Sequence, residues 1–255
     1  MTRRRPLAVL AAGVLGIGTL ATVLVAIEAL IRARIINPFV VPLPSAVVAA
    51  IPRIFDEENV GHRFWQTAQE AIWASALLVV IGIGVGVALH RWRNVRLATE
   101  TWIAALAAAP IVLMYPLFLV IFGRSATTIV MIGFVAGLAP VILKTTEGLA
   151  GTRKALIDVG KSFRATGIQQ FRKVLLPAAL PTIFVGLRLG LVFAMINIVG
   201  VEFLINFGGL GQLINELAER YDLPGTYGAI CFAVLASILV FALTERAERW
   251  LRPQR

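Results

Sequence analysis

The chain contains the stretch Ala126-Thr-Thr-Ile-Val-Met-Ile-Gly-Phe-Val-Ala-Gly-Leu-Ala-Pro-Val-Ile-Leu143, which carries no charged side chain. As an α-helix it would be about 27 Å long, close to the roughly 30 Å thickness of the hydrocarbon core of a bilayer. Within one such segment in lipid, only a helix pairs every backbone N–H and C=O group. The stretch therefore predicts a transmembrane helix.

Five further apolar runs repeat this pattern on either side. They cover residues 7–31, 71–89, 101–122, 182–203 and 227–243. The first run is longer than the core of a signal peptide, so we expect it to be retained as a span, and the last is at the short limit for a span. We expect a single transmembrane domain over residues 1–255, an all-α polytopic helix bundle of about six spans.

The composition agrees with a membrane protein. Apolar residues make up 58% of the 255 residues and charged residues only 15%, unlike an ordinary soluble domain. The formal net charge of +10 does not indicate nucleic-acid binding, because Lys and Arg lie between the apolar runs rather than on one face. Cys231 is the only cysteine, which excludes an intrachain disulfide.

The distribution of positive charge predicts the orientation. If the N-terminus is cytoplasmic, sixteen Lys and Arg residues lie on the cytoplasmic side and six on the opposite side. The positive-inside rule therefore places both termini in the cytoplasm. Residues 37–69 then lie outside, and their four prolines and acidic run Asp56-Glu57-Glu58 predict a turn and a short helix on the membrane surface.

The longest cytoplasmic connection, residues 147–181, is amphipathic. Gly160 and Gly167 punctuate it and Pro177 and Pro181 end it, which predicts two short helices, a bend and the entry to the fifth span. Its apolar residues recur at near-helical spacing among basic and polar ones. This apolar set comprises Leu149, Leu156, Val159, Phe163, Ile168, Phe171, Val174 and Leu175.

This loop contains Asp158-Val-Gly-Lys-Ser-Phe-Arg-Ala-Thr-Gly-Ile-Gln-Gln-Phe-Arg-Lys-Val-Leu-Leu-Pro177, which resembles the EAA loop of binding-protein-dependent ABC importer permeases. The family pattern is E-A-A, three residues, Gly, nine residues and I-x-L-P, and the fit has no gap. Pro177-Ala-Ala-Leu-Pro181 and Gly186-Leu-Arg188 resemble the taurine, alkanesulfonate and nitrate branch of the family. The resemblance extends over nearly the whole chain.

Four departures from the family pattern fall in the part of the loop that matters most. Asp158 stands in place of the Glu, Val159 and Gly160 in place of the two Ala, and Arg164 in place of the Gly. A glycine at such a bend permits backbone angles that a side chain disfavours. We therefore expect the bend to shift three residues, to Gly167; the other interpretation is that Arg164 stays helical.

The resemblance implies a type I ABC importer permease in the bacterial inner membrane, with no cofactor of its own. The implied partners are a second permease, two cytoplasmic ATPase subunits that bind ATP and Mg²⁺, and an extracytoplasmic substrate-binding protein. The second permease is either identical or different. ATP binding would pull the loops together and open the bundle outward. The implied contact with the ATPase comprises Asp158, Val159, Gly160, Arg164, Ala165, Thr166 and Gly167.

The resemblance also bears on the solute, which would be a small organic anion such as a sulfonate, or nitrate; other family members carry heterocyclic vitamin precursors. Candidates for the pathway are polar and aromatic residues, and one methionine, inside the apolar runs. Glu202 fits either a pathway-lining or a capping role, and Arg188 either snorkels to the surface or gates. The remaining candidates are Asn197 in the fifth run and Met114, Tyr115 and Phe118 after a predicted proline kink, where plain packing is the alternative.

Three pairs of glycines occur at the spacing that lets helix backbones approach closely in lipid, and they predict ordinary bundle packing. The pairs are Gly82 with Gly86, Gly133 with Gly137, and Gly186 with Gly190.

Two other classes of protein compete with an importer permease. A secondary transporter or channel without an ATPase predicts functional ionisable residues near the midplane, whereas Arg188 and Glu202 lie near the ends of their run. A membrane-embedded enzyme predicts clustered acid–base residues, but His62 and His90 are expected on opposite sides of the membrane. The segment 155–162 nearly matches a phosphate-binding loop but follows a predicted span instead of a buried strand, so we expect nucleotide on a separate chain.

Overall fold

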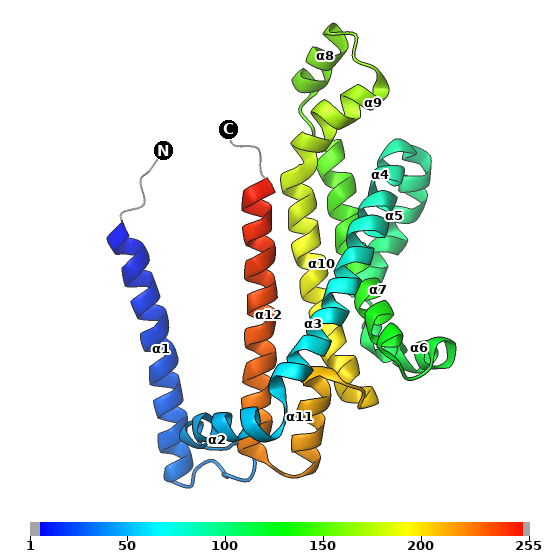
Figure 1. Ribbon diagram of the computed structural model, residues 1–255. Coiled ribbons are helices and arrows are strands. Elements are labelled where there is room, and N and C mark those ends of the chain that lie inside the picture. Colours follow the sequence, from blue (N-terminus) through cyan, green and yellow to red (C-terminus); the bar gives the residue numbers. More distant parts are fainter. Residues whose placement is uncertain (1–5, 252–255) are drawn as a thin grey trace. The chain divides into compact units, whose positions relative to one another are not determined.

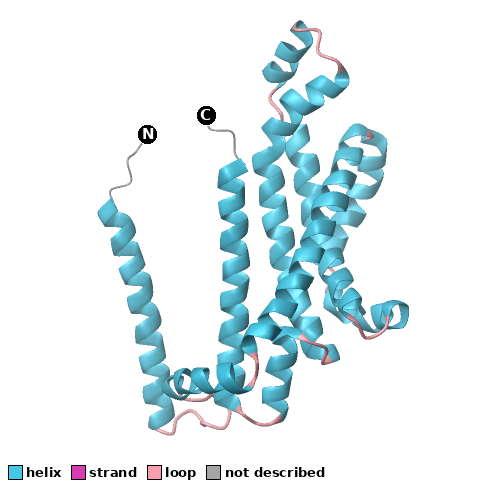
Figure 2. Cartoon of the chain, in the orientation of Figure 1, coloured by secondary structure: helices cyan, strands magenta, loops and turns pink. Residues whose placement is uncertain are grey.

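The computed structural model describes residues 6–251, and every regular element in that range is a helix (Figures 1 and 2). This confirms the predicted all-α class. Arg3, Arg4, Arg5, Arg252 and Arg255, which contribute to the predicted cytoplasmic charge, lie outside the described residues. The elements are α1 Pro6–Arg32, α2 Pro44–Glu57, α3 Val60–Leu77, the π-helix η1 Leu78–Gly82, α4 Ile83–Arg91, α5 Arg93–Ala108, the 3₁₀-helix η2 Ile111–Met114, α6 Tyr115–Phe122, α7 Ala126–Ala150, α8 Lys154–Ser162, α9 Gly167–Gln170, the π-helix η3 Phe171–Leu175, α10 Leu176–Ile205, α11 Gly209–Glu219 and α12 Leu223–Leu251.

Five helical stretches within the described residues are long and apolar enough to cross a membrane. A sixth candidate is a bent pair, α5 with η2 and α6, if the pair counts as one span. The prediction of about six spans therefore agrees with the structure. The five stretches are Leu15–Arg32, Val60–Arg91, Ala126–Ala150, Gly167–Ile205 and Leu223–Arg246.

The helix predicted over residues 101–122 is interrupted. Its two halves, Arg93–Ala108 and Ile111–Phe122, meet at 90°. The break follows from Pro110, which lacks a backbone N–H and disfavours the helical conformation at the residue before it. Ala109 accordingly has an extended backbone, with ψ 135°. The proline predicted to kink this segment does interrupt it, but the bend is a 90° corner between two helices, so the segment is not one continuous helix.

The chain forms two compact units. The larger unit contains residues 61–213 and the chain from Phe232 onward, and the smaller contains the chain up to Val60 together with residues 214–231. Each unit has its own buried side chains, and each is described separately below.

In the larger unit, α7 and α10 pack with their backbones in direct contact. A Cβ atom added to Gly137 would lie 2.5 Å from the carbonyl oxygen of Gly190, closer than real Cβ contacts come. A Cβ atom on Gly186 would lie 2.6 Å from the Cβ of Lys144, and one on Gly133 would lie 2.7 Å from the Ile198 side chain. The packing role predicted for these glycines is confirmed, since only a residue without a side chain fits.

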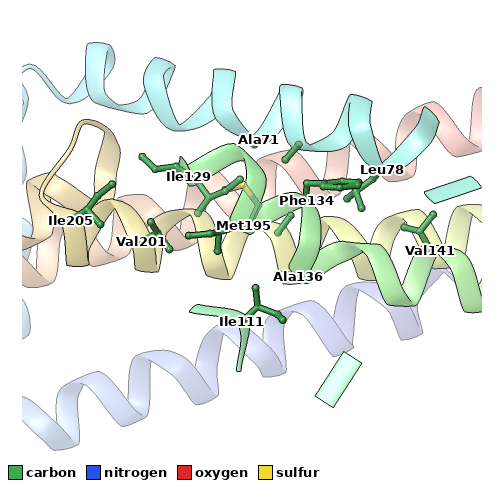
Figure 3. Close-up of a cluster of buried hydrophobic side chains, with 14 residues drawn as sticks. Ala71, Leu78, Ile111, Ile129, Phe134, Ala136, Val141, Met195, Val201 and Ile205 are labelled. Carbon is green, nitrogen blue, oxygen red and sulfur yellow. The ribbon is translucent and has the colours of Figure 1, made fainter. Parts of the chain in front are cut away.

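The main hydrophobic cluster of this unit lies along α7 (Figure 3). Its fully buried members include Ile129 and Val141 of α7, Leu78 of η1 and Val201 of α10. Ile111, just after the corner at Pro110, is also buried against this cluster. The corner is therefore fixed by core packing on its C-terminal side.

In the smaller unit, α2 is held to the turn before α12 by two ion pairs. Arg53 donates to the carboxylate of Asp222, and this hydrogen bond raises the pKa of Arg53. Arg220 donates to the buried carboxylate of Glu58 at 2.6 Å. Ile54, between these pairs, is fully buried. The short helix predicted within residues 37–69 is thus α2, but residues 60–69 belong to the long helix that follows.

Candidate functional site

The predicted coupling loop is a pair of short helices, α8 and α9, that project past the ends of α7 and α10 (Figure 1). The loop is anchored to these two helices by a small buried cluster. Phe171 and Leu175 of η3 pack against Leu149 of α7 and Ile183 of α10. The loop is therefore packed directly against both helices.

The turn between α8 and α9 has the geometry of a Schellman motif. The N–H of Ala165 donates to the carbonyl of Gly160 at 3.1 Å, and the N–H of Arg164 donates to Lys161 at 2.8 Å. In this motif the residue just after the end of the helix adopts a left-handed conformation, and glycine usually occupies that position. Here it is Arg164, with φ 52°.

This geometry corrects the prediction about the bend. The bend does not shift to Gly167, which is the first residue of α9, and Arg164 does not stay helical. Arg164 takes the left-handed conformation itself, at the position of the family's glycine. The Schellman hydrogen bonds satisfy the last carbonyls of α8 and hold the bend in place despite the side chain.

The second helix of the loop has a strong start signal despite its length of four residues. Thr166 and Gln169 form a capping box, in which each side chain bonds the backbone N–H of the other. Gln170 then donates to the carbonyl of Ile157 at 3.1 Å, which ties α9 back to α8. Side-chain hydrogen bonds therefore fix both the start of α9 and the contact of its last residue with α8.

The predicted contact residues lie together along this hairpin. Asp158 and Val159 are exposed on α8, while Gly160 is buried against Val174 and Gln170. The remaining four, Arg164, Ala165, Thr166 and Gly167, form the turn and the start of α9.

Two large apolar side chains of the loop are missing from the predicted contact. Phe163 is 83% exposed and Ile168 is 73% exposed, next to Val159 at 55%. All three belong to the apolar set that made the loop amphipathic. The amphipathic pattern could have identified them, because apolar side chains that are exposed together on a surface often mark a site of contact with another protein.

The residues predicted to line a pathway lie in different surroundings, and none of them lines the cavity beside α4, α5 and α7. Met114 is exposed, whereas Tyr115 and Phe118 pack against the main hydrophobic cluster. Asn197 donates to the carbonyl of Phe193 in its own helix at 2.8 Å. A pathway role for these residues stays a prediction.

Glu202 has the geometry of the capping role, the other role considered for it. Its side chain is fully buried, and Oε2 accepts from the backbone N–H of Gly211 at 2.7 Å. Gly211 lies in the first turn of α11, where backbone N–H groups have no partner within the helix. Arg188 lies beside Phe241 of α12, with its guanidinium carbon 5.1 Å from the ring centroid.

A cavity of about 470 Å³ opens beside α4, α5 and α7. Two ion pairs line it, Arg96 with Glu100 and Lys144 with Glu147 at 2.7 Å. Because both signs of charge are present, the cavity by itself selects neither an anion nor a cation.

The described residues thus form a bundle of apolar helices, and a two-helix loop stands on the ends of two tightly packed spans. The family model described as "Binding-protein-dependent transport system inner membrane component" matches residues 79–255, and the chain belongs to this family. It is thus the permease subunit of an ABC importer, as the resemblance of its loop predicted. The alternative of a transporter without an ATPase finds no support in these matches.

Several curated relatives cover most of the chain. It is 27% identical to the formylaminopyrimidine transport permease protein ThiX of Halalkalibacterium halodurans, over 88% of this chain and 90% of that protein. It is also 27% identical to the taurine transport system permease protein TauC of Escherichia coli, over 92% and 89%. The putative aliphatic sulfonates transport permease protein SsuC of Bacillus subtilis is 27% identical over 85% and 80%.

Among solved structures, an inward-facing form of the MetNI methionine ABC transporter has the same fold. The TM-score is 0.65, with 21% sequence identity over 74% of this chain and 94% of that chain. The predicted type I importer permease fold is confirmed.

Proposed function

We propose that the α8–α9 hairpin docks in a cleft of a cytoplasmic ATPase subunit and passes its ATP-driven closure to α7 and α10. The observation that carries this proposal is the exposed apolar group of Val159, Phe163 and Ile168 on a hairpin whose helices are held together by side-chain hydrogen bonds. Asp158 and Arg164 lie beside this group and supply polar contacts at its edge.

The complete importer then contains this permease, a second permease, two ATPase subunits that bind ATP and Mg²⁺, and an extracytoplasmic substrate-binding protein. The membership of the chain in a binding-protein-dependent family supports these partners. The assembly works in the bacterial inner membrane, with both termini and the hairpin in the cytoplasm. Catalysis lies on the ATPase chains.

The substrate is a small organic anion of the sulfonate class. The relatives named for taurine and aliphatic sulfonates support this assignment, and the relative named for formylaminopyrimidine defines the competing solute. Binding of each solute to the purified substrate-binding protein, followed by uptake into vesicles that contain the whole importer, distinguishes the two. Uptake of the pyrimidine without uptake of a sulfonate would replace the anion.

The docking proposal is tested with Phe163→Ser in the importer purified from its native membrane. We expect most of the ATPase subunit to be lost during purification in mild detergent, because the variant removes the largest apolar contact of the hairpin. Tyr221→Ser is the control, since Tyr221 is 89% exposed but lies in the smaller unit, outside the hairpin. Full retention of the ATPase by the Phe163 variant would contradict the docking surface.

Charge reversal gives a second measurement on the same surface. Asp158→Lys with Arg164→Glu should separate ATP hydrolysis from uptake, measured together in proteoliposomes. Normal transport by this double variant would remove both residues from the contact.

A further inference from the structure

Two carboxyl groups meet inside the larger unit, away from the residues assigned to the ATPase contact. Glu70 of α3 is 6% exposed and Glu202 of α10 is fully buried. The two side chains are in hydrogen-bonding contact. Both residues lie in candidate membrane spans, where an unpaired charge is costly.

The contacts of Glu202 fix it as the acceptor of this pair. Its Oε2 accepts from the N–H of Gly211 and its Oε1 accepts from the hydroxyl of Thr67, each at 2.7 Å. The Thr67 hydroxyl itself accepts from the N–H of Leu210 at 2.9 Å. The carbonyl of Arg63 could also accept the hydroxyl proton of Thr67, but it is farther away, at 3.3 Å. Both oxygens of Glu202 thus accept hydrogen bonds, as expected of a carboxylate.

The environment of Glu70 is the opposite. Its Oε2 is buried, and no N–H or O–H group of the described residues donates to it. A second carboxylate in contact with Glu202 would be repelled and would leave a buried acceptor without a partner. A neutral carboxyl group removes the repulsion, because its other oxygen can carry the proton and donate it to Glu202. The unpartnered Oε2 is then an uncharged carbonyl oxygen, which costs less to bury than a carboxylate oxygen.

We propose that the Glu70–Glu202 pair is a proton-binding site, in which Glu70 holds one proton and donates it to the Glu202 carboxylate. The ligand is the proton alone. It ties α3 to α10 at the point where α10 also holds the start of α11. Residues 209–213 of α11 carry no titratable side chain, and the adjoining segments carry Arg63 on α3 and Arg124 before α7. Arg124 donates to the carbonyls of Ile205 and Asn206, not to the pair.

The start of α11 is built around this carboxylate. A Cβ atom on Gly209 would lie 2.0 Å from Oε1 of Glu202, and one on Gly211 would lie 2.6 Å from the Cβ of Glu202. The backbone therefore approaches Glu202 too closely for its oxygens to turn away. The orientation of the acceptor is fixed, so the proton must come from Glu70.

The test compares isosteric variants of the two residues in the full-length chain. Glu70→Gln keeps a donor toward Glu202, so its melting midpoint in detergent should stay within about 1 °C of the unsubstituted protein. Glu202→Gln turns an N–H₂ group toward Gly211 or Thr67, and its midpoint should fall by about 4 °C or more, which is a loss of one to two kcal/mol for a chain of this size. The reverse order of the two variants would overturn the assignment, and so would equal tolerance.

Infrared spectroscopy supplies a readout that packing alone would not move. The difference spectrum between the unsubstituted protein and Glu70→Gln should contain the C=O band of one protonated carboxyl group. Absence of that band would overturn the proposal. Melting with and without Na⁺ or K⁺ checks for a metal cation in place of the proton: stabilisation by one of these ions that Glu70→Gln abolishes would also overturn it.

Discussion

Arg164 is the residue at which the loop departs furthest from ordinary backbone preferences. A left-handed conformation costs a residue with a side chain about 1–2 kcal/mol, and glycine avoids this cost. Arg164 nevertheless adopts φ 52° at the end of α8. The compensation lies in the two backbone bonds of the turn and in the capping box that follows.

The first prediction is therefore that Arg164→Gly stabilises the hairpin by about 1 kcal/mol, since the backbone strain disappears. Slower hydrogen exchange of the α8 and α9 amides would show it. Arg164→Ala is the matched control, because it removes the charge but keeps the Cβ atom. If the two variants exchange equally, the strain does not govern the hairpin.

At the scale of elements, the contact between α7 and α10 brings two helix backbones together. The second prediction is that Gly137→Ala lowers stability by about 1–3 kcal/mol, because its Cβ would meet the Gly190 carbonyl and the Leu78 side chain. Gly84→Ala on α4 is the control, since nothing lies within 4 Å of its added Cβ. Melting of the detergent-solubilised protein measures both, and equal midpoints would contradict the close approach.

The helices themselves were largely predictable, and the corner and the buried pair were not. Apolar runs predict spans because a segment in lipid must be apolar and must pair its own backbone hydrogen bonds as a helix. The glycine spacings predicted the close contacts between helices. Pro110 indicated a kink, but its size depends on where Ile111 finds buried neighbours. Glu70 lies one residue before the predicted span 71–89, and its partner Glu202 is 132 residues away in the sequence. Such a contact requires the tertiary structure.

The loop shows the same division between local and tertiary information. Its two helices follow from local signals, including the cap at Thr166. The handedness at Arg164 does not, because it is set by bonds to Gly160 and Lys161 in the preceding helix. Sequence alone therefore located the candidate contact but misplaced its bend.

At the scale of the whole molecule, the charge distribution makes a topological prediction. In a Cys231→Ala background, Ser162→Cys in the hairpin should react with a membrane-impermeant thiol reagent only in inverted vesicles. Asp56→Cys in α2 should react only in intact cells whose outer membrane admits the reagent. Both residues are exposed. Labelling of both positions from the same side would contradict an orientation with the hairpin and both termini in the cytoplasm.

The backbone contact between α7 and α10 also has a mechanical meaning. Side-chain layers between helices can repack and absorb a push, but two backbones in van der Waals contact have nothing left to compress. The contact of Gly137 with Gly190 would thus make α7 and α10 move together as a rigid pair. A displacement at their α8–α9 end would then also displace the other end of α10, where Glu202 holds the first turn of α11.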